Sequence, residues 1–533
     1  MRSAKMVHGL KTCLVSFAVS VALLTAHAHA DTLDLSTSTI ADLQAAMNKG
    51  SLTSEKLVSL YLARIQAYDQ QGPKLNTVIT LSKTALAEAR ALDAERKAKG
   101  PRSPLHGIPV LAKDVFDTRD MPTSGGFKPM ATSQPSHDAF VIDKLRKSGA
   151  IILGKLNQSD WYGVASQGAS TLQGQVISPY NPKKSPGGSS SGTGSAIAAW
   201  FAAVGLGSDT TGSIVIPSTL ANLVGISATH GLVSRTGMMW SSPSQESGGP
   251  MTRSVYDAAA VLDAIAGYDA ADLATQASIG KLPSQPYTSF VDKQGLKGAR
   301  IGILSEMIRK GPQHTEGTAL FEKAVADFKK AGATVIEPVL TGLDLPESQT
   351  LAGAPTYERA VAIDAYLARL PATAPIRTVA EMIDKGGKLV KPAIVEASQL
   401  SALERDTQLI AATKHQQVMR DAILAVMDKY QLDAVILPYR TIVDVEVGLP
   451  PNSGGGGGNS DGRNAIASYT GLPTIVVPGG FFASDGMPFA VQFIGRPFAE
   501  PSLIKFASGF EATTKHRKAP PTTPALKGEL LTF

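Results

Sequence analysis

The sequence predicts a single large α/β domain. Three observations support this: short apolar runs typical of buried strands, amphipathic helical patterns between them, and the lack of an internal repeat. Of the 533 residues, 43% are hydrophobic and 18% are charged, as in a globular protein with a sizeable core. This composition argues against disorder and for a packed, enzyme-sized fold.

The predicted elements follow from local patterns. Helices are expected where apolar residues recur every three or four positions, and strands where apolar runs are bounded by glycine and polar residues. "TSEK" is expected to cap a helix. In chain order we predict two helices over 39–69 and one over 81–100, a strand in 107–117, a helix over 138–149, a strand in 149–157, an alanine-rich buried helix over 195–207, strands in 298–306 and 333–340, a mostly helical stretch over 319–430, strands in 432–440, 472–481 and 488–496, and a mobile glycine-rich loop over 450–462.

The first thirty residues are typical of a secretory signal. Three cations, Arg2, Lys5 and Lys11, precede an apolar stretch over 14–24, and small residues end at Ala30. We expect cleavage after Ala30, a periplasmic or secreted protein, and no membrane association afterwards, because a spanning helix needs about 18 apolar residues. An uncleaved N-terminal anchor is the alternative.

Removing this segment changes charge and thiol content. The formal net charge falls from +6 to +3, because the segment has three cations and no acid. So small a charge does not imply a nucleic-acid partner. Cys13 is the only cysteine of the chain. The mature protein therefore has no thiol for a disulfide, a cysteine nucleophile or a thiolate metal site.

Residues 185–218 combine a run of three serines between glycines with a further serine behind a glycine. A phosphate loop is disfavoured, because no Gly-Lys-Ser/Thr follows. Ser190 is the centre of a G-x-S-x-G pattern, but a proline-broken loop rather than a strand precedes it, and the histidines are scattered. The third interpretation pairs the serines with a lysine base at Lys113, beside Asp114. The alternative for Lys113 is a salt bridge at a strand end.

Six blocks in order resemble the amidase signature family from about residue 35 to 520. After the expected signal peptide over 1–30, the resemblance implies one domain over 31–533, with a mixed, mostly parallel central sheet covered by helices on both faces. It also implies that the mostly helical region 310–440 is variable and lies on the substrate side. The blocks are "LHGIPVLAKD", "GAIILGKLNQSDW", "SPGGSSSGTGSAIAA", "GSDTTGSIVIPSTLANLVGISATHGLVSRTG", "GPMTRSVYDAAAVLDAIAG" and "LPTIVVPGGF" through "VQFIGRP".

The resemblance also implies a catalytic triad. Ser213 would be the nucleophile, Ser189 the bridging serine after a cis peptide bond, and Lys113 the terminal base. A neutral lysine needs desolvation against its usual pKa of about 10.4, so we expect an alkaline rate optimum. The further roles implied are backbone donors to the oxyanion at Thr210, Thr211, Gly212 and Ser213, support of that turn by buried Asp209, loop-holding hydrogen bonds from Ser190 and Ser191, and neither a metal nor a cofactor.

Two positions depart from the commonest family form. Thr211 replaces a glycine and Val215 an arginine, and the valine resembles the branch that contains bacterial peptide amidases. The expected substrates are C-terminal peptide amides or aryl and aliphatic amides, met by a monomer or homodimer. An esterase of the same mechanism and a catalytically silent secreted binding protein are the alternatives. Trp161, Tyr162 and residues 237–240 could line an acyl pocket or be plain core.

Overall fold

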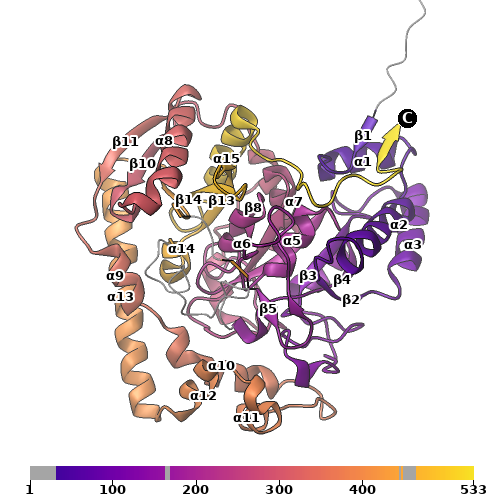
Figure 1. Cartoon of the computed structure of the whole chain (residues 1–533), viewed down its shortest axis with the longest axis horizontal. Coiled ribbons are helices and arrows are strands. Elements are labelled where there is room, and N and C mark those ends of the chain that lie inside the picture. Colours follow the sequence, from indigo (N-terminus) through magenta and orange to yellow (C-terminus); the bar gives the residue numbers. More distant parts are fainter. Residues whose placement is uncertain (1–31, 163–167, 443–445, 448–463, 533) are drawn as a thin grey trace, which may run out of the picture.

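A computed structural model describes residues 32–162, 168–442, 446–447 and 464–532 (Figure 1). The expected signal segment and the glycine-rich loop over 450–462 lie outside the described residues. No helix in the described parts of the chain is long and apolar enough to cross a membrane.

An eleven-stranded mixed sheet organises the described residues. Parallel pairs join its three outer strands on one flank and β7, β3 and β4 towards the other, whereas the six remaining neighbouring pairs are antiparallel. In sheet order the strands are β11 (Thr334–Val339), β10 (Arg300–Leu304), β12 (Ala434–Pro438), β14 (Pro488–Ile494), β13 (Thr474–Phe481), β8 (Val224–Ser227), β9 (Ser247–Thr252), β7 (Val204–Asp209), β3 (Pro109–Lys113), β4 (Ile151–Leu156) and β2 (Val78–Leu81).

Two short antiparallel pairs lie outside this sheet. β1 (Thr32–Asp34) pairs with β15 (Leu530–Thr532), and β5 (Ala169–Ser170) pairs with β6 (Gly174–Gln175). The C-terminal segment therefore returns across the molecule from α15 to the N-terminal end of the described chain (Figure 1).

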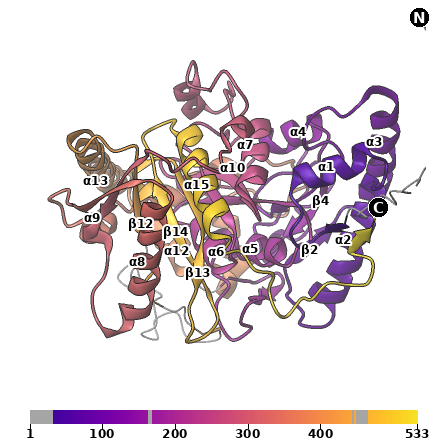
Figure 2. The ribbon, with the colours of Figure 1, turned by 90° about the horizontal axis from the view of Figure 1, so that it is seen from above.

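Helices cover both faces of the sheet, as predicted. α15 packs against both α7 and α8 (Figure 2), and α5 packs against α6. The helices are α1 (Ile40–Asn48), α2 (Ser54–Ile65), α3 (Ala85–Lys99), α4 (Phe140–Lys147), α5 (Ser191–Ala198), α6 (Val215–Leu220), α7 (Val255–Ile265), α8 (Thr315–Lys330), α9 (Leu345–Leu351), α10 (Pro355–Leu367), α11 (Val379–Gly386), α12 (Pro392–Gln399), α13 (Ala402–Lys429), α14 (Ile466–Thr470) and α15 (Glu500–Thr514).

Most predicted elements are confirmed. The Thr53 side chain caps α2 by accepting from the Lys56 N–H, and the stretch 319–430 is mostly helical, with β11 and several loops between the helices. The single helix expected over 195–207 is wrong, because α5 ends at Ala198 and the second half of the run forms β7. β7 is buried along its whole length between two strands, a context that overrides local propensity.

Candidate active site

Lys113 lies at the carboxyl end of an inner strand of the sheet. It is the last residue of β3, which runs parallel to β7, so both strands end at the same edge. The side chain is fully buried. Its Nζ donates to Ser189 Oγ at 2.6 Å and to Ser208 Oγ at 2.9 Å. The predicted base and the predicted bridging serine therefore lie in direct contact.

Asp114, the sequence neighbour of Lys113, pairs with a different lysine. Its Oδ1 lies 2.9 Å from Lys155 Nζ, which also donates to Thr123 Oγ1 at 2.7 Å. The ion pair of Asp114 is therefore made with Lys155. Burial lowers the pKa of Lys113 to about 7, against the opposing charges of Glu246 and Asp209.

The loop before α5 holds Ser189 in place. The Gly188–Ser189 peptide bond is cis, as the resemblance implied. Ser190 Oγ donates to the Ser208 carbonyl at 3.2 Å and accepts from the Ser208 N–H at 3.3 Å, while Ser191 Oγ donates to the Gly168 carbonyl at 3.4 Å. Ser190 thus binds the β7 backbone, and no strand leads into it as a nucleophile elbow requires.

A carboxylate shapes the turn between β7 and α6. Asp209 Oδ1 accepts from the Gly212 N–H at 2.7 Å and from Ser468 Oγ at 2.6 Å, and its Oδ2 accepts from the Ile214 N–H at 2.8 Å. Gly212 has a φ of +101°, which favours glycine. The turn therefore fixes the backbone on both sides of Ser213, whose side chain is buried.

Among the described residues, the predicted nucleophile does not contact the rest of the predicted triad by a hydrogen bond. In the described chain no hydrogen bond links Ser213 to Ser189. The Gly212 N–H is engaged by Asp209, whereas the N–H groups of Thr211 and Ser213 donate to no described residue. Thr210 Oγ1 donates to Glu246 Oε2 at 2.7 Å. The donors left for an oxyanion in the turn therefore include Thr211 and Ser213.

Two residues at this site were missed by the sequence analysis. Ser208 is the second hydroxyl on Lys113, and Glu246 is a fully buried carboxyl at the same end of the sheet. Ser208 offered a signal, because it directly precedes Asp209 in the serine-rich stretch. Glu246 offered none, because it meets the turn only when β9 pairs with β7.

Three of the aromatic and methionine candidates belong to the buried core. Trp161, Met238 and Met239 are buried, and the Trp161 ring packs edge-on against Tyr366 of α10 with centroids 6.0 Å apart. Tyr366 Oη also donates to Asp117 Oδ1 at 2.7 Å. The helical region thus packs directly against the segments on either side of the site. The Tyr162 side chain lies outside the described set.

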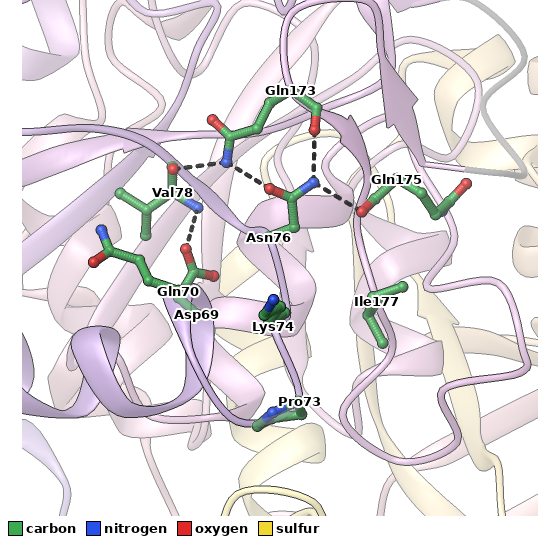
Figure 3. Close-up of a pocket in the computed structure, with 9 residues that line it drawn as sticks. All are labelled: Asp69, Gln70, Pro73, Lys74, Asn76, Val78, Gln173, Gln175 and Ile177. Atoms are coloured by element: carbon green, nitrogen blue, oxygen red, sulfur yellow. Dashed lines mark hydrogen bonds between the residues drawn. The ribbon is translucent and has the colours of Figure 1, made fainter.

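A cavity of about 680 Å³ lies apart from these residues, beside the β5–β6 pair (Figure 3). Asn76 Nδ2 donates to the carbonyls of Gln173 and Gln175, and Gln173 Nε2 donates back to Asn76 Oδ1. Asp69 accepts from both the N–H and Oγ1 of Thr77 at 2.6 Å. The polar side chains of Asp69, Asn76 and Gln173 thus hydrogen-bond to groups of the protein around the cavity. These bonds hold the β5–β6 pair against the segment that leads into β2.

Comparison with known proteins decides the family. A family model described as amidase matches residues 56–504. The chain belongs to the amidase family. A probable amidase of Arabidopsis thaliana is 32% identical over 514 residues, covering 92% of each chain. A glutamyl-tRNA(Gln) amidotransferase subunit of Cupriavidus necator is also similar, with 32% identity over 91% of this chain and 98% of its own.

Solved amidase structures share the whole fold. The peptide amidase of Stenotrophomonas maltophilia is 36% identical, with a TM-score of 0.80 and coverage of 91% of this chain and 99% of its own. The prediction of a single α/β amidase fold is thereby confirmed. The protein is an enzyme that hydrolyses amide C–N bonds.

Proposed function

We propose that the protein is an exported amidase that forms an acyl-enzyme at Ser213, with Ser189 as proton relay and Lys113 as base. The observation that carries this proposal is the buried amine of Lys113, which hydrogen-bonds Ser189 and Ser208 while the adjacent Asp114 is paired elsewhere. A lysine with its pKa lowered to about 7 is available as a neutral base near neutral pH.

The proposed reaction has two halves. As Ser213 Oγ attacks the amide carbonyl, its proton passes to Ser189, whose own proton passes to Lys113 Nζ. Backbone N–H groups of the turn, from Thr210 and Thr211 to Gly212 and Ser213, stabilise the oxyanion, and the free N–H groups of Thr211 and Ser213 best support this role. The proton returns through Ser189 to the leaving nitrogen, and water then hydrolyses the ester formed on Ser213.

The favoured substrates are C-terminal peptide amides. The likeness to the peptide amidase supports this choice, as does Val215, which is buried at the start of α6 where the common family form has arginine. Aryl and aliphatic amides are the next class. We also propose that residues 1–30 direct export and are removed after Ala30, and that the enzyme acts as a monomer or homodimer.

An amide library tests the activity, with Ser213→Ala as control. We expect wild-type kcat/KM for its best amide to fall by about 10³-fold or more in the variant. A serine-reactive phosphonate should label Ser213, as detected by mass spectrometry. An active Ser213→Ala variant, or a protein inert towards amides and matched esters, would contradict the proposal, and a preference for the matched esters would favour the esterase alternative.

Fractionation of an expressing bacterium tests export. The mature N-terminus is expected at Asp31 in the periplasm or medium, as determined by N-terminal sequencing. Recovery of an uncleaved chain from the cytoplasm or the membrane would contradict that part of the proposal.

A further inference from the structure

Glu246 directly precedes β9 and lies next to the turn between β7 and α6 that contains Ser213. β9 pairs antiparallel with β7 so that Ser247 faces Asp209, which places Glu246 opposite Thr210. The Glu246 carboxyl is fully buried, and its Oε2 accepts from Thr210 Oγ1 at 2.7 Å and from the Ser241 N–H at 3.4 Å. Its Oε1 is buried without a hydrogen-bond partner among the described residues.

Lys113 approaches the same place from the other side. β7 lies between β9 and β3 in the sheet, so Glu246 and Lys113 flank the end of one strand. Burial raises the pKa of the Glu246 carboxyl and lowers the pKa of the Lys113 amine, while the charge of each opposes the shift of the other. The two groups are thus a buried amine and carboxyl within electrostatic reach.

Two other charged residues, Asp209 and Arg359, interact electrostatically with this pair. Asp209 of β7 acts on both groups, but its oxygens accept from the turn and from Ser468. Burial lowers the pKa of the Arg359 guanidinium on α10, and the charge of Glu246 opposes that shift. Glu246 is therefore the carboxyl in this set that has an oxygen left to face a charge on Lys113.

A second buried glutamate shows that an unpartnered oxygen alone does not make a site. Glu500 is as buried as Glu246, its Oε1 accepts from the Thr229 N–H at 2.7 Å, and its Oε2 has no partner in the described chain. No amine acts on the pKa of Glu500. What distinguishes Glu246 is that only β7 separates its strand end from that of Lys113, and that the charge of Lys113 acts on the pKa of its carboxyl.

We propose that Glu246 is a positioning residue for Lys113: its carboxylate stabilises the ammonium that forms when Lys113 takes the proton of Ser189. The inference rests on the proposed function. No proton moves to Glu246 in this step. Its carboxylate keeps its negative charge, which stabilises the positive charge that forms on Lys113. The role is analogous to that of the aspartate which stabilises the imidazolium in Ser-His-Asp hydrolases.

The test is the pH dependence of kcat/KM in Glu246→Gln. Without the negative charge the pKa of Lys113 falls, so the acid limb should move to lower pH by about one unit, while the plateau falls by about tenfold or more because the ammonium is no longer stabilised. A glutamine that merely fails to hold Thr210 would lower the rate and leave the acid limb in place. That outcome would overturn the proposal.

Matched variants separate charge from structure. Thr210→Val removes the hydrogen bond to Glu246 but keeps the carboxylate, so its acid limb should stay at the wild-type position. Glu500→Gln makes the same substitution at an equally buried carboxyl away from Lys113, and should shift no limb. A shift of similar size in either variant would contradict the assignment.

Two further measurements keep the test decisive. If Glu246→Gln does not fold, Glu246→Asp keeps the charge and should retain the wild-type acid limb with a lower plateau; a displaced limb in that variant would count against the proposal. Labelling of Ser213 by a fluorophosphonate, followed against pH, reports the base without an amide substrate. If wild-type Ser213 is not labelled, the proposed function fails; if it is labelled with a limb that Glu246→Gln leaves unmoved, only the present inference fails.

Discussion

Two fully buried lysines lie on neighbouring parallel strands. In the register of β3 and β4, Ala112 faces Lys155 and Lys113 faces Leu156, so the two lysine side chains point to opposite faces of the sheet. Lys155 meets the carboxylate of Asp114 at 2.9 Å, whereas Lys113 meets two hydroxyls. Equal burial therefore serves two purposes, because Lys155 forms an ion pair with a carboxylate, whereas the hydroxyl partners of Lys113 leave its amine able to act as a base.

The largest expected effect on kcat/KM comes from removing the amine of Lys113. Lys113→Met keeps the apolar stem and deletes the base, so kcat/KM for an amide should fall by about 10³-fold or more. The free energy of unfolding should fall by less than about 2 kcal/mol, because the hydrogen bonds of the Lys113 amine go to two neutral hydroxyls. Steady-state kinetics and urea denaturation measure both effects. Residual activity within tenfold of wild type would show that Lys113 is not the base.

The same substitution at Lys155 should lower stability strongly and leave kcat/KM nearly unchanged. Lys155→Met leaves the Asp114 carboxylate buried without its cation, which is expected to cost about 3–5 kcal/mol of the free energy of unfolding. The folded variant should keep kcat/KM within about threefold of wild type, because the polar contacts of Lys155 go to Asp114, Pro122 and Thr123 and to no residue of the proposed triad. Measuring both variants under one set of conditions gives the matched pair. A larger rate loss in Lys155→Met than in Lys113→Met would contradict the roles given to the two lysines.

This contrast also shows what the sequence could and could not predict. Lys113, Ser189 and Ser213 were predicted from blocks that each lie within a short stretch of chain. The partner of Asp114 was not, because Lys155 comes from a strand some forty residues later and reaches Asp114 only through the register of β3 and β4. Glu246 was missed for the same reason, since pairing of β9 with β7 brings it to Thr210.

The fold shows the same division between local and distant information. The apolar runs of β3, β4 and β10 to β14 were predicted from local pattern, whereas β7 was assigned to a helix because its alanine-rich approach favours one. β8 and β9 were not predicted as strands; β9 contains two glycines and a proline, which are depleted in strands. Neighbouring strands, rather than propensity, fix these segments.

The pH profile of the rate should report the protonation of the Lys113 amine. Burial lowers the pKa of Lys113 to about 7, so the neutral amine is the main form above that pH and the ammonium below it. kcat/KM for an amide should level off above about pH 7 and fall about tenfold for each unit below it, since only the neutral amine accepts a proton. Lys155→Met should share this limb. A profile without an acid limb near neutrality would contradict the assignment of Lys113 as base.

The smallest effect is expected at the second hydroxyl on Lys113. Ser208→Ala removes a hydrogen bond of 2.9 Å to the amine and leaves Ser189 as the partner at 2.6 Å. Loss of one such bond is worth about 1–1.5 kcal/mol, so kcat/KM should fall by about five- to tenfold. Ser190→Ala is the matched control, because it removes a hydroxyl from the neighbouring loop that binds only the Ser208 backbone. If both variants lose the same activity, Ser208 acts through the fold of β7; a selective loss in Ser208→Ala, with an unchanged melting temperature, shows that the hydroxyl orients the amine towards Ser189.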